Sequence, residues 1–113
     1  MKTTSDHPET KYLDALLAAR GPSHREDEVR AVVTGILDTL GADHETDGAG
    51  NVTVRIAGAD TGAAPVVIAA HMDELGLVVT KIEDDGRLLV DRSGGLHPHK
   101  IGECAVDLLT DGT

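Results

Sequence analysis

Three titratable residues, His71, Asp73 and Glu74, follow directly on an apolar part of the chain. The run before them, residues 66–70, consists of small and β-branched residues without alternation, a pattern typical of a strand buried on both faces of an α/β sheet. Open α/β sheets bind their ligands just beyond the carboxyl ends of the strands. The sequence therefore predicts an imidazole and two carboxylates at the place where such a fold does its chemistry.

The spacing of His71 and Asp73 favours metal chemistry. Imidazole is a common metal ligand, and a metal-bound His usually donates its other ring N–H to a carboxylate, which fixes its tautomer and orientation. Residues two apart in an extended segment point to the same side, so we expect Asp73 beside His71. The alternative is that both residues merely begin a solvated loop, since short motifs have many false matches.

Composition narrows the classes of partner and compartment. The chain has 113 residues, of which 40% are hydrophobic, enough for one domain with a modest core. Its formal net charge of −10 argues against nucleic-acid and membrane partners. Cys104 is its single cysteine, so no internal disulfide can form. No apolar run has the length of a membrane span or the form of a signal peptide, and we expect a cytoplasmic protein.

Two helices are expected ahead of the titratable residues. The first begins near Pro8 and ends at Gly21-Pro22, because Pro disfavours helical geometry in the preceding residue. Ser23 and Glu26 form a capping box, with Ser23 as the N-cap of the second helix. Gly41 ends this helix. Its apolar stripe follows the helical repeat and comprises Val29, Val32, Val33, Ile36, Leu37 and Leu40.

Strands are expected after the helices. The turn-rich residues 47–51 separate two strands, and the second of these, residues 52–56, alternates apolar and polar side chains. Residues 66–70 form the central buried strand. The first 75 residues therefore combine helices and strands in one α/β layer.

Only strands and turns are expected beyond Gly76. The β-prone residues 77–82 and 87–90 flank a hairpin turn. A last strand spans residues 104–110, with Cys104 as a buried thiol. The change of character near Gly76 predicts the start of a second, β-rich domain.

Taken in order, several of these segments resemble the binuclear metallo-aminopeptidases, a family that includes glutamyl and deblocking aminopeptidases and the tetrahedral, dodecameric peptidases. The resemblance covers nearly all of residues 11–113. One departure is His24, where that family usually has Gly. The matching segments are Gly21-Pro22-Ser23 with Glu26 and Val29-Arg30, Asp47 with Gly50-Asn51-Val52, Ala70 to Gly76 with Val79, Asp85-Gly86, Gly94-Gly95 and Pro98.

The resemblance implies an α/β fold, with residues 1–75 as the N-terminal part of a zinc-exopeptidase-like α/β/α sandwich. Residues 76–113 would begin an inserted β-rich oligomerisation domain and stop within it. The implied activity is removal of N-terminal residues from peptides by a homo-oligomeric enzyme with two divalent metal ions, Zn or Co. His71 would ligate one metal, and Asp73 would belong to the catalytic machinery by orienting that His. Glu74 belongs to the motif without an independent role.

A two-metal peptidase needs further ligands and a carboxylate base. In the family these residues come later in a much longer chain, and a single His does not hold a metal tightly. We therefore expect the 113 residues to be an incomplete fragment, inactive alone. The alternative is a non-catalytic remnant that binds a partner or intact subunits through exposed sheet edges.

Two other readings of the chain have less support. A zinc site of His71, His97 and His99 is disfavoured, because Pro98 stiffens the second cluster in a Gly-rich stretch. A polysaccharide hydrolase is disfavoured because no carboxylate pair with glycosidase spacing can be identified. The chain also has one Tyr and no Phe or Trp to form an aromatic sugar platform.

Overall fold

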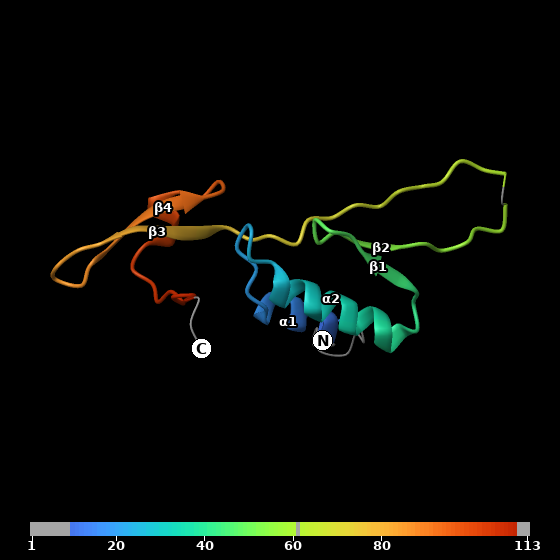
Figure 1. Ribbon diagram of the computed structural model, residues 1–113, viewed down its shortest axis with the longest axis horizontal. Coiled ribbons are helices and arrows are strands. Elements are labelled where there is room, and N and C mark those ends of the chain that lie inside the picture. The colour runs from blue at the N-terminus through green and yellow to red at the C-terminus, as the bar shows by residue number, and fades with distance from the viewer. Residues whose placement is uncertain (1–9, 61, 111–113) are drawn as a thin grey trace, which may run out of the picture. The chain divides into compact units, whose positions relative to one another are not determined.

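The computed structural model describes residues 10–60 and 62–110 (Figure 1). The chain divides into two compact units, with the division in the sequence between Glu74 and Leu75. Helices and antiparallel strands are both present, so the expected mixed α/β class is confirmed. The first unit contains α1 (Thr10–Ala18), α2 (Asp27–Leu40), β1 (His44–Thr46) and β2 (Val52–Val54). The second contains β3 (Gly76–Ile82), β4 (Leu88–Ser93) and α3 (Pro98–Ile101).

Helices α1 and α2 contact each other and form the centre of the first unit (Figure 1). Among the described residues only Ala19, just after α1, and Val29, in the first turns of α2, are buried apolar residues. The expected stop at Gly41 is confirmed. Gly41 adopts a left-handed backbone with φ of 66°, and its N–H donates to the carbonyl oxygen of Asp38 at 3.0 Å. The expected start of the first helix, near Pro8, lies outside the described residues.

The capping box predicted at the start of the second helix is wrong. Helix α2 begins at Asp27, and its N-cap residue, Glu26, makes no side-chain capping bond. Ser23 lies further upstream, in a turn closed by a 2.8 Å bond from the N–H of Arg25 to the carbonyl of Pro22. The carboxylate of Glu26 accepts instead from the N–H of His24 at 2.7 Å. The turn thus holds Ser23 too far from the helix to cap it.

Strands β1 and β2 pair antiparallel, with His44 opposite Val54 and Thr46 opposite Val52. The loop between them is organised by Asp47, whose carboxylate accepts from the N–H groups of Ala49 and Asn51 and from the side-chain amide of Asn51, each at 2.9 Å. These bonds lower the pKa of Asp47, and the Asn51 side chain is the largest cause. The predicted turn at residues 47–51 is therefore confirmed, with a strand on either side.

Arg30 ties α2 to this loop. Its Nε donates to the carbonyl oxygen of Gly50 at 2.9 Å, and its guanidinium also pairs with Asp27 one turn earlier on the helix. A bond from a helix side chain to a loop carbonyl fixes the hairpin against the helix without requiring a large apolar contact. The first unit is thus held together by directed polar bonds as much as by burial.

The buried central strand predicted at residues 66–70 is wrong for the described chain. This segment has no regular secondary structure, and Figure 1 shows it within the long connection that follows β2. Val66, Val67 and Ile68 are 90%, 82% and 94% exposed. A strand buried on both faces needs hydrogen-bonded neighbours and covering layers. None of the strands formed by the described residues pairs with this segment.

The hairpin predicted after Gly76 is confirmed. Strands β3 and β4 pair antiparallel, with an irregularity between Val79 and Lys81. The turn is closed by a 2.8 Å bond from the N–H of Glu83 to the carbonyl of Arg87. All of the large apolar side chains on both strands are at least one-third exposed.

The rest of the second unit departs from expectation. Residues 97–101, expected as part of a loop, include the short helix α3, which has Pro98 as its first residue. The last predicted strand, residues 104–110, is wrong: this segment has no regular secondary structure and belongs to neither of the two sheets that the described residues form. Cys104 is consequently exposed rather than buried. In the described ranges, no helix combines the length and hydropathy needed to cross a membrane.

The Asp47 loop predicts how the β1–β2 hairpin responds to acid. A carboxyl group whose pKa is lowered on folding stabilises the fold above its unfolded pKa of about 4, and this contribution is lost as pH falls through the folded pKa. Asn51→Ala removes the side-chain hydrogen bond that lowers the pKa of Asp47 most. We therefore expect this variant to raise the pKa of Asp47 toward its ordinary value. A carbon-13 NMR titration of the Asp47 carboxyl group measures this shift. An unchanged pKa in the variant would contradict the assignment.

Candidate functional site

Residues 73 and 74 lie against the segment that connects α1 to α2. The N–H of Glu74 donates to the carbonyl oxygen of Gly21 at 2.7 Å, and the N–H of Gly21 donates to Oε1 of Glu74 at 2.9 Å. Pro22 and Glu74 form an isolated parallel bridge. Glu74, to which the sequence assigned no independent role, thus joins two segments that are about fifty residues apart.

Ser23 and His71 contact the same carboxylate from different sides. The hydroxyl of Ser23 donates to Oδ2 of Asp73 at 2.5 Å. Nδ1 of His71 lies 2.9 Å from Oδ1 of Asp73 and 3.0 Å from the backbone carbonyl oxygen of the same residue. The three side chains therefore form a chain of contacts from Ser23 through Asp73 to His71.

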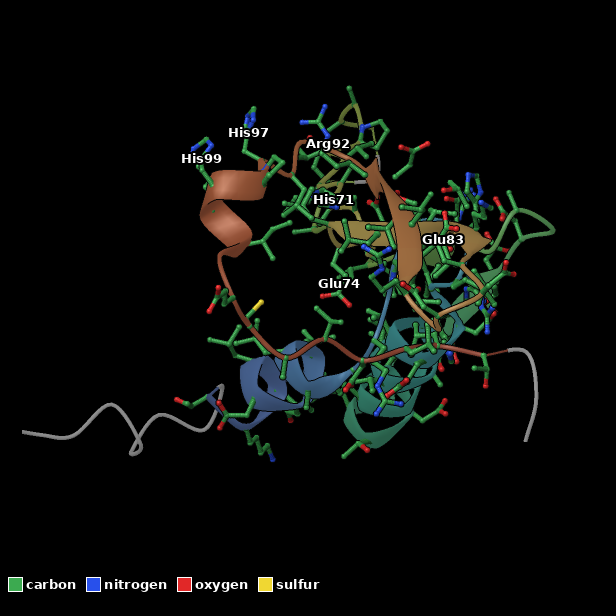
Figure 2. The ribbon with its side chains drawn as sticks, turned by 90° about the vertical axis from the view of Figure 1, so that its left-hand side faces the viewer. His71, Glu74, Glu83, Arg92, His97 and His99 are labelled. Atoms are coloured by element: carbon green, nitrogen blue, oxygen red, sulfur yellow. The ribbon has the colours of Figure 1, made fainter. Side chains whose placement is uncertain are left out.

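These contacts define the tautomer of a neutral His71. A carboxylate oxygen and a carbonyl oxygen can only accept hydrogen bonds, so Nδ1 must carry the proton. Nε2 then bears the lone pair that can bind a metal. The side chain of His71 is 84% exposed, whereas that of Asp73 is 42% exposed, so the ring is open to a ligand while its carboxylate partner is partly covered. His71 and Glu74 are labelled in Figure 2.

The charge state of Asp73 suits this arrangement. The hydrogen bond from Ser23 is the largest effect that lowers the pKa of the Asp73 carboxyl, and the bond and charge of His71 lower it further, while partial burial opposes them. An ionised Asp73 is a stronger acceptor for the His71 N–H than a protonated one. At neutral pH the carboxylate can therefore hold the imidazole in one orientation.

Gly21 permits the close approach that makes the site possible. A Cβ at this position would lie 2.6 Å from Cγ2 of Val29 and 3.2 Å from the carbonyl oxygen of Met72. The first distance is far below van der Waals contact, and Val29 is one of the few buried side chains. The backbone of the connecting segment thus passes between α2 and residue 72 with no space for a side chain.

The remaining predicted candidates are not brought into a metal cluster. The described residues contain no group of three or more His, Cys, Asp or Glu side chains that could hold a metal ion. The ring of His97, just before α3, stacks on that of His99, within α3, with centroids 5.5 Å apart, and Figure 2 shows the two rings side by side. The three-His zinc site that the sequence analysis disfavoured is therefore not formed by the described residues.

Sequence reasoning missed two contacts of this site, Ser23 with Asp73 and Glu74 with Gly21. The helix-capping pattern predicted that Ser23 caps α2, although its hydroxyl is bonded to a residue fifty positions away. The available signal was that both segments, Gly21-Pro22-Ser23 and residues 71–74, belong to the motifs that carry the family resemblance. Co-occurrence of motifs does not by itself say that they touch.

Comparison with known proteins places this site in a family. A family model described as M42 glutamyl aminopeptidase matches residues 50–113, which include His71, Asp73 and Glu74. The chain belongs to the M42 glutamyl aminopeptidase family. The expected family is therefore confirmed, and the matched region contains the whole of the segment that follows β2.

Two curated relatives agree with this membership. A glutamyl aminopeptidase of Lactococcus lactis is 36% identical over 84 residues, which cover 74% of this chain and 24% of that protein. A lysyl aminopeptidase of Pyrococcus furiosus is 37% identical over 73 residues, which cover 65% of this chain and 20% of that protein. The chain thus spans a quarter or less of the length of these two relatives.

The close approach at Gly21 generates a prediction. We expect Gly21→Ala to destabilise the first unit by about 1–3 kcal/mol, because the new methyl group overpacks against Val29. Gly35→Ala is the matched control: Gly35 lies within α2, and a Cβ added there would meet nothing within 4 Å, so the change should stabilise the helix by about 0.5–1 kcal/mol. Amide hydrogen exchange of α2 measures both effects. If the two substitutions changed the stability of the first unit in the same direction, the packing argument would be contradicted.

His24 generates a second prediction. Among the described residues it is the one non-glycine residue with positive φ, which is 72°. A side chain in this left-handed region costs about 1–2 kcal/mol, which Gly avoids at some cost in entropy.

We therefore expect His24→Gly to stabilise the turn of residues 22–25 by roughly 0.5–1 kcal/mol relative to His24→Ala, which keeps the unfavourable Cβ. Exchange rates of the amides in this turn and at the start of α2 provide the measurement. If Ala stabilised the turn as much as Gly, backbone strain at residue 24 would be ruled out as the cause.

Proposed function

We propose that the protein to which these residues belong is a metal-dependent aminopeptidase that removes N-terminal residues from peptides. The single observation that carries this proposal is the contact of His71 Nδ1 with Asp73, which leaves Nε2 available as a ligand in a chain of the M42 family. Both curated relatives are named aminopeptidases. One name specifies glutamyl and the other lysyl substrates, so the preferred N-terminal residue is left open in the proposal.

In this proposal His71 supplies one ligand of a centre with two divalent ions, Zn or Co. Asp73 orients the ring and favours the tautomer with a free Nε2. A bound metal pair would polarise the scissile carbonyl and activate water. The other ligands and the carboxylate base are not assigned to any of the described residues, so we derive no reaction step from this chain.

The proposal extends to setting and assembly. We take the protein to be cytoplasmic and its complete form to be a homo-oligomer, with residues 76–113 at the beginning of the inserted β-rich domain and residues 1–75 in the catalytic domain. We further propose that the 113 residues alone lack peptidase activity. A catalytic zinc site uses three protein ligands, whereas the described residues form no cluster of three potential ligands, and we assign only His71 as a ligand.

A second function is favoured by a different observation. Strands β3 and β4 expose several large apolar residues, and a two-stranded hairpin leaves both of its edges open. Such edges pair readily with other chains. A non-catalytic role in binding a partner or intact subunits is therefore the alternative to an enzymatic one.

The experiment that separates these functions uses the protein isolated from its native source and the same protein carrying His71→Ala. We expect hydrolysis of Glu- or Lys-p-nitroanilide to need a divalent metal and to fall by more than about 100-fold in the variant, since loss of a ligand exceeds the loss of an orienting partner. His99→Ala is the matched control and should retain activity.

The 113-residue chain is assayed in parallel for metal binding and turnover. Full activity of the His71→Ala protein would refute the site assignment. Tight binding of two metals with turnover by the 113-residue chain would refute its proposed inactivity. Absence of hydrolysis in the native-source protein would leave the partner-binding role as the better account.

A further inference from the structure

We propose that Ser23 is a positioning residue for His71, acting through the carboxylate of Asp73. This inference deepens the proposed function, on which its catalytic meaning rests. Its structural content is separate: the Ser23 hydroxyl fixes one carboxylate oxygen so that the other stays on Nδ1 of His71. Ser23 reaches the ring through Asp73, so its effect on chemistry is indirect.

The geometry of the carboxylate explains why a hydroxyl is useful here. A carboxylate at the end of a short side chain can rotate, and rotation would carry Oδ1 away from the imidazole. The Ser23 bond to Oδ2, at 2.5 Å, lies in the range of strong charge-assisted O–H···O⁻ bonds. With Oδ2 held, the plane of the carboxylate is set and Oδ1 remains 2.9 Å from Nδ1. The ring is itself largely exposed and has little packing to orient it.

The backbone around Ser23 is held in the right place by independent contacts. The paired bonds between Gly21 and Glu74 fix the connecting segment two residues before Ser23. The bond from Arg25 to Pro22 closes the turn that contains Ser23. Ser23 thus projects its hydroxyl from a segment bonded on both sides, so little entropy remains to be lost when it contacts Asp73.

A purely structural role is the competing explanation. In that case Ser23 would only join two segments, and its removal would loosen the turn without changing the tautomer of His71. The two explanations differ in one observable, the fraction of neutral His71 that carries its proton on Nδ1. Free imidazole side chains populate both tautomers, whereas the contacts seen here require the proton on Nδ1.

The test is nitrogen-15 NMR of the histidine ring in the 113-residue chain at about pH 9, where imidazole is ordinarily neutral. In the parent chain we expect the Nδ1–H tautomer of His71 to predominate. Ser23→Ala should shift the population at least several-fold toward the Nε2–H tautomer. Ser23→Thr, which keeps the hydroxyl, should retain the parent ratio. Ser23→Val, which has nearly the shape of Thr but lacks the hydroxyl, should not.

Two controls keep the result interpretable. Thr34→Ala removes a hydroxyl that bonds only to carbonyls of its own helix, so it should leave the His71 tautomer unchanged. The amide shifts of Gly21 and Glu74 report whether the connecting segment stays docked in each variant. The Thr and Val variants share shape and β-branching, so a folding defect common to both cannot produce a difference between them.

The inference is overturned if Ser23→Ala or Ser23→Val keeps the parent tautomer ratio, or if Ser23→Thr fails to retain it. In the native-source enzyme, Ser23→Ala should lower metal affinity by about 10- to 100-fold, as expected for loss of a group that orients a ligand. If Ser23→Ala shifts the tautomer but the native-source protein has no peptidase activity, the positioning role stands and the proposed enzymatic function is refuted. If the native-source protein is active but Ser23→Ala leaves the tautomer unshifted, the enzymatic function stands and the positioning role is refuted.

Discussion

The bonds between the segment 21–23 and residues 73–74 are the constraint on which the site depends. The Glu74 N–H donates to the Gly21 carbonyl, and the Gly21 N–H donates to the Glu74 carboxylate. The Ser23 hydroxyl donates to the Asp73 carboxylate. These contacts join residues about fifty positions apart, in a unit whose described residues include very few buried apolar side chains. Directed polar bonds therefore provide much of the positioning that a larger core would provide by packing, and His71 takes its orientation from them.

The motif residues singled out in the sequence acquire physical roles in this arrangement. Gly21 gives the backbone room to pass Val29 and Met72, and Asp47 organises the loop that Arg30 bonds to α2. His24 occupies a left-handed position for which Gly is better suited. Most of these motif residues therefore shape the backbone or hold another side chain. Among them, His71 presents a largely exposed ring whose Nδ1 contacts the carboxylate of Asp73.

Local patterns in the sequence were sufficient for the elements closed by nearby residues. Both hairpin turns, helix α2 and its Gly41 stop depend on contacts within a few positions, and each is present. The predicted strands at residues 66–70 and 104–110 failed, because a strand is completed only by partners that other segments provide. Their apolar composition suits burial, whereas burial itself requires neighbours. The capping box failed because α2 begins only at Asp27, with Glu26 as its N-cap, while the Ser23 hydroxyl is bonded to a distant carboxylate.

The sequence by itself determined the mixed α/β character, the family, and His71 with Asp73 as the residues of interest, since residue type and a spacing of two are local properties. Only the tertiary structure decided which carboxylate oxygen faces the ring, that Ser23 holds the other, and that Glu74 binds Gly21. Those choices depend on how the chain returns to its own earlier segment. Hydrogen bonds are short-ranged and directional, so they are settled only once folding has brought both partners within about 3 Å.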